Sequence, residues 1–264
     1  MLSVQTNNAS NIAQNSVNKS NDLLSNAMER LSTGLRINSA ADDAAGLQIA
    51  TRMNANVVGM ETANRNVSDA TSMLQTADGA LDELTTIANR QKELATQAAN
   101  GVNSTEDLAA LDAEFQELSK EVTRIVTDTE YSGNPLFASL EAGVTFQIGA
   151  SSGETLDVTT NAITAVAGDL KAGANAAIDL VDTFIDAVGA ERSTLGANIN
   201  RLGHTASNLA NVTENTKAAA GRIMDTDFAV ETANMTKNQL LVQAGTNILS
   251  SANQNTGLVM SLLG

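Results

Sequence analysis

A repeat of apolar residues spaced three and four apart runs through residues 60–98 and limits what this chain can fold into. Its first nine positions are Met60, Ala63, Val67, Ala70, Leu74, Ala77, Leu81, Leu84 and Ala88, with no polar interruption. Such a heptad keeps one narrow apolar stripe facing partner helices. A helix over these residues would be about 58 Å long at 1.5 Å per residue. The pattern therefore predicts a rod-like helix, far longer than an average globular one.

Two further segments, residues 108–125 and 178–209, repeat the same spacing. The first has the stripe Leu108, Leu111, Phe115, Leu118, Val122 and Ile125. The second has one polar interruption, Arg192. Three such stripes bury best against one another in a slender bundle. We therefore predict a mainly α fold, in which long heptad-patterned helices form an elongated bundle.

Composition and charge argue against several classes of function. A net charge of −15 disfavours nucleic acid and anionic lipid as partners, because both require clustered Lys and Arg. The sequence contains no run of eighteen apolar residues, which is the length that would predict a membrane span. The chain has no cysteine, and its single histidine, His204, has no neighbours with metal-ligand spacing. We expect no catalytic residue, cofactor or metal, and hence no enzyme.

Each end of the chain has its own short apolar pattern. Near the N-terminus it consists of Leu24, Met28, Leu31 and Leu35. Near the C-terminus it consists of Phe228, Met235, Val242 and Leu249 at seven-residue steps, flanked by Leu241 and Ile248. Pairing the two ends as a coiled coil is the economical arrangement. The first residues also lack the basic and apolar regions of a cleavable signal peptide.

The middle of the chain interrupts the helical pattern. We expect helices over about residues 41–100, 105–129 and 171–221, with capping residues at Ser39 with Asp42, at Ser104 with Asp107, and at Asp225 or Asp227. Between them, alternating apolar residues around 144–148 and 156–158 indicate a β-hairpin. The turn-rich region of about 131–170 is expected to lie on the outer surface.

Residues 29–46, which read ERLSTGLRINSAADDAAG, resemble the amino-terminal motif of bacterial flagellins. The match continues at residues 63–66 (ANRN) and 93–101 (ELATQAANG). Residues 233–237 (ANMTK), 243–246 (QAGT) and 261–264 (SLLG) resemble the flagellin carboxyl end. The resemblance covers nearly the whole chain, but the large variable outer domains of long flagellins are missing.

This resemblance implies a structural subunit that self-assembles into the flagellar filament for motility, outside the cell. It implies a core coiled-coil domain formed by residues 1–40 and 223–264, with a rod domain of residues 41–222 between them. The two terminal patterns would then be polymerisation residues. The chain's partners would be further copies of itself in a helical homopolymer, an export chaperone and a filament cap protein, after signal-free export through the flagellar type III apparatus.

Three further positions match residues that the flagellin-sensing Toll-like receptor of vertebrates contacts in this family: Arg90, Leu94 and Glu114. Arg90 and Leu94 are one helical turn apart, and Glu114 comes from the antiparallel neighbour, so all three are expected to share a surface. Their primary role is expected to be contact between subunits.

Two alternatives remain from the sequence. A hook–filament junction protein of the same family shares similar terminal motifs. A non-polymerising coiled-coil binding protein would have the same stripes. Filaments seen by negative-stain microscopy after warming with a kosmotropic salt would select flagellin.

Overall fold

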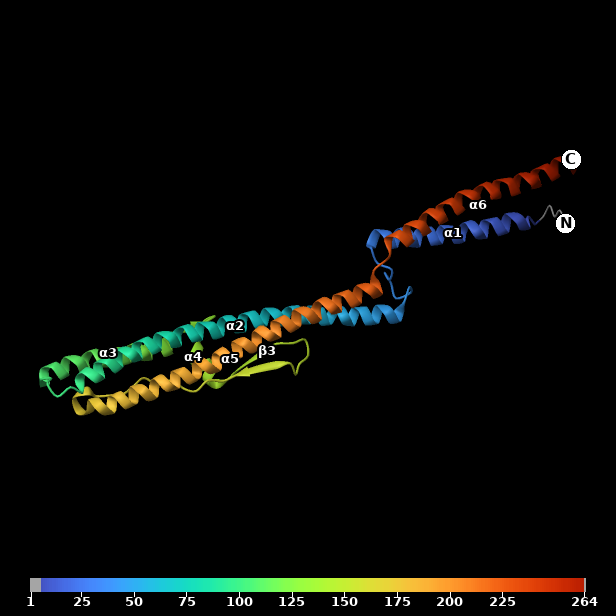
Figure 1. Cartoon of the computed structure of the whole chain (residues 1–264). Helices are drawn as coiled ribbons and strands as arrows, with labels where there is room; N and C mark the ends of the chain where they lie inside the picture. Colours follow the sequence, from blue (N-terminus) through green and yellow to red (C-terminus); the bar gives the residue numbers. More distant parts are fainter. Residues whose placement is uncertain (1–5, 264) are drawn as a thin grey trace. The chain divides into compact units, whose positions relative to one another are not determined.

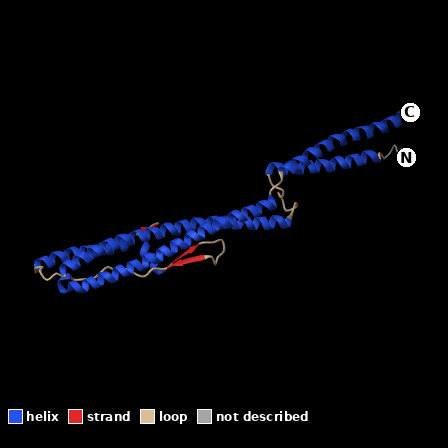
Figure 2. Cartoon of the chain, in the orientation of Figure 1, coloured by secondary structure: helices blue, strands red, loops and turns tan. Residues whose placement is uncertain are grey.

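The computed structural model describes the backbone of residues 6–263 and the side chains of residues 6–254, so the outermost residues of the expected terminal segments, 1–5 and 264, lie outside it. Most of the chain is helical, as the stripes predict (Figure 2). The helices are α1 (Asn8–Thr33), α2 (Ala44–Ala98), α3 (Thr105–Asp128), α4 (Leu136–Ala142), α5 (Leu170–Met224) and α6 (Phe228–Leu263). The strands are β1 (Glu130–Tyr131), β2 (Asn134–Pro135), β3 (Val144–Gln147) and β4 (Thr155–Val158).

The chain forms two compact units. Unit 1 comprises Met1–Ala55 and Asn215–Gly264, and unit 2 comprises Asn56–Glu214. The expected domain borders, at residues 40/41 and 222/223, lie at or near the links between helices, whereas the two units divide inside α2 and α5. Both helices continue through the division because neither contains a proline, the only one being Pro135.

Unit 2 is a bundle in which α2, α3 and α5 lie along one another (Figure 1). All nine stripe positions of residues 60–88 are buried, none more than 7% exposed. They pack against buried residues of the two other helices. These are Phe115 and Val122 of α3, and Val181, Val188, Leu195 and Leu202 of α5. Ion pairs of Lys92 with Asp182 and of Arg192 with Asp78 join α2 to α5 in antiparallel order. The heptads therefore predicted the core of this unit correctly.

Two of the three expected helix starts are confirmed. Ser104 and Asp107 form the complete capping box of α3, and Asp227 accepts the N–H groups of residues 229 and 230 at the start of α6. The expectation for α2 is wrong, because that helix begins one residue after Asp43, whose carboxylate accepts the Gly46 N–H at 2.9 Å. Asp42 instead folds back onto Ser39.

The middle region contains the expected hairpin, with β3 and β4 antiparallel in the register Val144↔Val158. The expectation that all of residues 131–170 lies outside is wrong. Helix α4 and the tight β1–β2 turn were not anticipated, and seven apolar side chains of this region are buried: Leu136, Phe137, Leu140, Leu156, Val158, Val166 and Leu170. They are buried because α3 alone leaves part of the α2–α5 stripe uncovered, and the hairpin region closes it.

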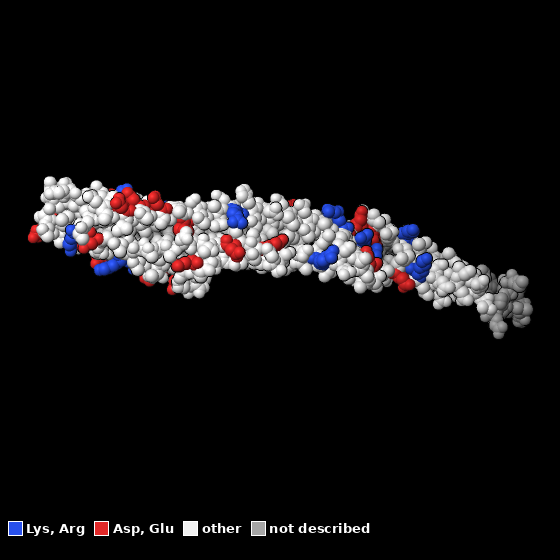
Figure 3. Space-filling model, turned by 90° about the horizontal axis from the view of Figure 1, so that it is seen from below, with Lys and Arg blue, Asp and Glu red and all other residues white. Residues whose placement is uncertain are grey.

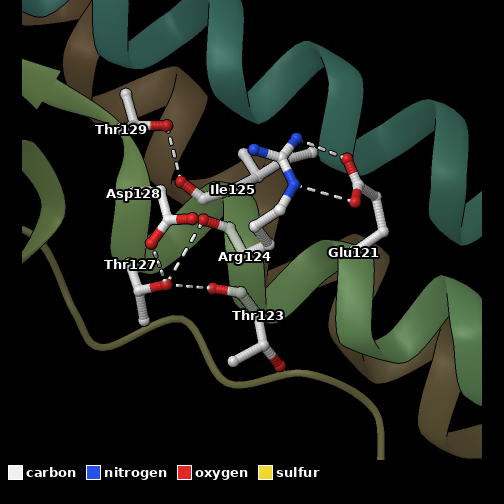
Figure 4. A network of polar contacts seen from close by, with 7 residues as sticks. All are labelled: Glu121, Thr123, Arg124, Ile125, Thr127, Asp128 and Thr129. Carbon is white, nitrogen blue, oxygen red and sulfur yellow. Dashed lines mark hydrogen bonds and ion pairs between the residues drawn. The ribbon is translucent and has the colours of Figure 1, made fainter.

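Side-chain contacts mark the point where α3 ends and extended chain begins (Figure 4). Arg124 pairs with Glu121 on the outer side of the last turns, with its Nη2 2.6 Å from Glu121 Oε1. The Thr127 hydroxyl donates to the Thr123 carbonyl oxygen, and the Thr129 hydroxyl donates to that of Ile125. The helix ends without a capping glycine: Thr129 is its C-cap in extended conformation, and the Thr129 N–H also donates to the Ile125 carbonyl oxygen.

Candidate self-assembly surface

In unit 1, helices α1 and α6 pack against each other along their length. Buried or half-buried positions recur at alternating steps of three and four on both helices, which is the seam of a two-stranded coiled coil. We call these positions the seam. On α1 they are Ser10, Ala13, Val17, Ser20, Leu24, Ala27 and Leu31. On α6 they are Glu231, Met235, Asn238, Val242, Gly245, Leu249 and Ala252.

Polar contacts fix the two helices in antiparallel register. At one end, Asn7 Nδ2 donates to the carbonyl oxygen of Ala252 at 2.9 Å. At the other end, Arg30 approaches Glu231 at 3.9 Å, and the Thr226 N–H donates to the carbonyl oxygen of Gly34. The coiled coil expected from the two terminal patterns is therefore present within a single chain.

Small residues let these helices approach closely. Ala27 is 1% exposed and Ala13 is 7% exposed. A Cβ atom at Gly245 would lie 2.5 Å from Val17 Cγ2, far inside van der Waals contact. The seam therefore depends on the absence of a side chain at Gly245.

The terminal residues that were expected to form two stripes fall into two groups, one in the seam and one facing solvent. Leu24, Leu31, Met235, Val242 and Leu249 lie in the seam and are half-buried. The other members of the C-terminal pattern, together with Met28, face solvent: Met28 is 49% exposed, Phe228 58%, Leu241 47% and Ile248 60%.

The expected α1 stripe is wrong at two of its four positions. Leu35 lies beyond the end of α1 and forms an isolated β-bridge with Asp225. The spacing of three and four instead selects Ala27, which was overlooked because a small residue adds little apolar area.

A second apolar surface lies outside the seam. We call it the outer face, and its large exposed side chains are Ile12, Leu23, Met28, Phe228, Val230, Leu240, Leu241 and Ile248. No charged residue precedes Lys19 or follows Lys237, and Figure 3 shows a white surface next to the grey end. Large apolar side chains exposed in this number are typical of a site of association.

The charges of the chain are distributed unequally between the units. Unit 1 contains seven Lys or Arg and seven Asp or Glu, so its formal net charge is zero. Unit 2 contains eight Lys or Arg and 23 Asp or Glu, so it carries the whole net charge of −15. The unit with most of the exposed apolar side chains is thus the neutral one.

The three positions expected to share a surface of the bundle do not all reach it. Arg90 donates through Nε and Nη2 to Glu114 Oε1, at 3.0 and 2.7 Å, and through Nη1 to Glu93. These hydrogen bonds, first to Glu114 and then to Glu93, raise the pKa of Arg90 above its usual value. Leu94 is only 1% exposed, so its expected surface position is wrong. It lies one turn beyond the buried Gln91 and packs into the bundle.

No group of three metal-binding side chains occurs among the described residues. Within the same part of the chain, none of the helices is both long and apolar enough to cross a membrane.

Comparisons with known proteins agree with this architecture. The bacterial flagellin N-terminal helical region matches residues 4–142, and the bacterial flagellin C-terminal helical region matches residues 178–263. A flagellin of Halalkalibacterium halodurans is 44% identical over 246 residues, which is 90% of each chain. Flagellin B of Vibrio anguillarum is 32% identical in an alignment of 374 residues that covers all of both proteins, whereas this chain has 264. The Vibrio protein therefore contains residues that this short form lacks.

A solved structure is also similar. The crystal structure of Bacillus cereus flagellin superposes with a TM-score of 0.51 at 35% sequence identity, over 55% of this chain and 88% of that one. These matches do not favour a hook–filament junction protein or a non-polymerising coiled coil. With both family regions matched and a curated relative aligned over nine-tenths of its length, the chain belongs to the bacterial flagellin family.

Proposed function

We propose that this chain assembles into a filament by burying the outer face of α1 and α6 between copies. As a flagellin, it is a structural subunit of the bacterial flagellar filament and not an enzyme. The observation that supports the proposed contact is the exposure of eight large apolar side chains on a coiled coil whose own seam is already filled.

Burial of that face supplies the driving force. A large apolar side chain gains roughly 1.5–3 kcal/mol when it leaves water. A contact between different patches of neighbouring copies generates a helical polymer when the rotation from one copy to the next does not close a ring. The seam residues hold α1 and α6 together so that both contribute to one surface.

The same face suggests partners before assembly. An exposed apolar surface promotes aggregation, so we propose that an export chaperone covers the carboxyl end and that a cap protein receives the chain at the filament tip. Export would proceed through the flagellar type III apparatus without a cleaved signal peptide. The filament would lie outside the cell.

A vertebrate receptor contact is a separate part of the proposal. Arg90 and Glu114 have side chains about half exposed, at 50% and 47%, and are available to the flagellin-sensing Toll-like receptor or to a neighbouring subunit. The buried Leu94 would act only by supporting the position of Arg90. If an Arg90→Ala variant activated the receptor fully in a cell reporter assay, the proposed receptor contact would be excluded.

The assembly contact is tested by Ile248→Asp in the full chain. The substitution places a carboxylate on the outer face, where burial of an unpaired charge costs several kcal/mol. Gln239→Asp is the matched control: Gln239 is exposed, is not one of the outer-face residues, and lies on the side of α6 opposite Ile248, because the two are nine residues apart at about 100° each. We expect the control to pellet as filaments and Ile248→Asp to stay in the supernatant with unchanged unit 2 stability. Filaments of normal length from Ile248→Asp would exclude the proposed contact.

A further inference from the structure

The turn between α2 and α3 contains Asn100–Gly101, the single Asn–Gly pair of the chain. Both residues are exposed. A Cβ atom built at Gly101 would have nothing within 4 Å, so the space around its backbone is open. An asparagine followed by a glycine is the sequence in which the next backbone nitrogen attacks the side-chain amide most readily, because glycine adds no steric hindrance.

We propose that Asn100 is a site of spontaneous deamidation, which marks each copy of the protein with its age. The Gly101 nitrogen loses its proton to water and forms a bond with Asn100 Cγ. Nδ2 takes up a proton from water, the bond between Cγ and Nδ2 breaks, and the nitrogen leaves as ammonia. Water then opens the resulting succinimide at either carbonyl and yields aspartate or isoaspartate at this position.

The structure leaves both reacting groups free. Within the described chain, the Asn100 side chain and the Gly101 N–H have no hydrogen-bond partner. Only the Asn100 backbone is held: its N–H donates to the Gln97 carbonyl oxygen, and its carbonyl oxygen accepts from the amide and side chain of Asn103. Residues 99–103 lie outside both helices, so the backbone is not restrained in helical geometry. The attack therefore requires no helix to unwind.

Two other pairs with a small following residue are blocked. Asn103 Nδ2 donates to the carbonyl oxygen of Gln97 at 2.6 Å, and the Ser104 N–H donates to Asp107 Oδ2 at 3.0 Å. Asn38 Nδ2 likewise donates to the carbonyl oxygen of Leu35. The Ser39 N–H is held by Asp42 Oδ2. In each pair the amide side chain and the attacking nitrogen are both engaged, in contrast to Asn100–Gly101.

The product changes the turn. Deamidation adds a negative charge beside the C-terminal end of α2, which is the negative end of the helix dipole. The isoaspartate product also lengthens the main chain by one methylene group between α2 and α3. Both effects strain the bonds that Asn103 makes across this turn.

The experiment is peptide mapping by mass spectrometry of the purified full chain, incubated at mildly alkaline pH, folded and in urea. We expect Asn100 to deamidate at similar rates in both conditions, and Asn103 and Asn38 to react much more slowly when folded than in urea. Gly101→Ala should suppress the reaction at Asn100 without disturbing the fold, since a Cβ there meets open space. An unmodified Asn100 in the folded chain, with ready reaction in urea, would overturn the proposal. Filament formation does not enter this readout.

Discussion

At the scale of single residues, a buried carboxylate connects α3 to the start of α5. Asp112 is 8% exposed. It accepts the Leu170 N–H at 3.1 Å, and Lys171 Nζ lies 3.4 Å from its other oxygen. Burial raises the pKa of Asp112, but the hydrogen bonds from Leu170, Gln116 and Lys171 outweigh it, so the net pKa is below its usual value. The ionised form is therefore the one that stabilises the fold.

We predict that Asp112→Asn lowers the free energy of unfolding of the chain by about 1.5–3 kcal/mol at neutral pH, the usual contribution of a hydrogen bond to a charged group. Because the pKa is lower in the folded state, the contribution is complete above the unfolded value near 3.9 and disappears as the pH falls through the folded-state pKa. Urea denaturation at several pH values measures the difference between the two proteins.

Asp186→Asn is the control for this prediction, since Asp186 is exposed and has no hydrogen bond or ion pair in the described structure. It should match the parent protein at every pH. A difference between Asp112→Asn and the parent that persists undiminished in acid would show that Asp112 acts through packing and not through its charge.

Polar residues inside the bundle could not be predicted from the sequence. The stripe of residues 60–88 continues at the same spacing to Gln91, which is 0% exposed and whose side-chain nitrogen donates to Ser119 Oγ at 2.9 Å. A polar residue at a heptad position ends an apolar pattern in the sequence, although it can be buried when a partner such as Ser119 lies opposite. Leu94 was expected on the surface for a different reason, its match to a position that the receptor contacts in the resembling family, but it is 1% exposed.

At the scale of elements, the pairing of α1 with α6 depends on steric fit more than on apolar area. We predict that Gly245→Ala weakens this pairing, because its Cβ would meet Val17 Cγ2 at 2.5 Å and the helices would have to separate. Hydrogen exchange of the full chain should show lower protection in Asn8–Thr33 and Phe228–Leu263 and unchanged protection in unit 2.

Gly189→Ala is the matched control, a glycine in the interior of α5 where an added Cβ meets nothing within 4 Å. There the substitution should stabilise the helix by roughly 0.5–1 kcal/mol. Equal protection of α1 and α6 in Gly245→Ala and the parent would mean that Val17 moves aside and the seam tolerates a methyl group.

The predictable elements are the long ones. The bundle helices were recognised because their stripes repeat over many turns, as in the nine positions of residues 60–88. Helix α4 was missed because its seven residues are too few for a period to emerge. The seam was assigned only in part, because Ala27 and Gly245 line it while the larger Met28 and Leu241 lie outside. Where helices approach closely, small residues fill the contact, so the largest apolar residues of the sequence do not indicate which positions are buried.

At the scale of the whole molecule, the two units impose opposite requirements on assembly. Unit 1 is neutral and exposes most of the large apolar side chains. Unit 2 has a net charge of −15, so the acidic units of neighbouring copies repel one another when assembly brings them close together. Burial of the outer face drives association, whereas repulsion between the acidic units opposes it.

We predict that the critical concentration for filament assembly falls as NaCl is raised from low ionic strength. Screening shortens the reach of repulsion between exposed charges to about 8 Å at 0.15 M salt, while apolar burial persists.

Salt also strengthens apolar association, so a control must separate the two effects. We use a Glu83→Gln, Asp186→Asn double variant, which removes two exposed, unpaired charges of unit 2 and leaves the outer face intact. The variant should assemble at a lower critical concentration in low salt and depend less steeply on NaCl, as measured by sedimentation. Parallel salt dependences for the two proteins would show that repulsion between the acidic units does not control assembly, even if both form filaments.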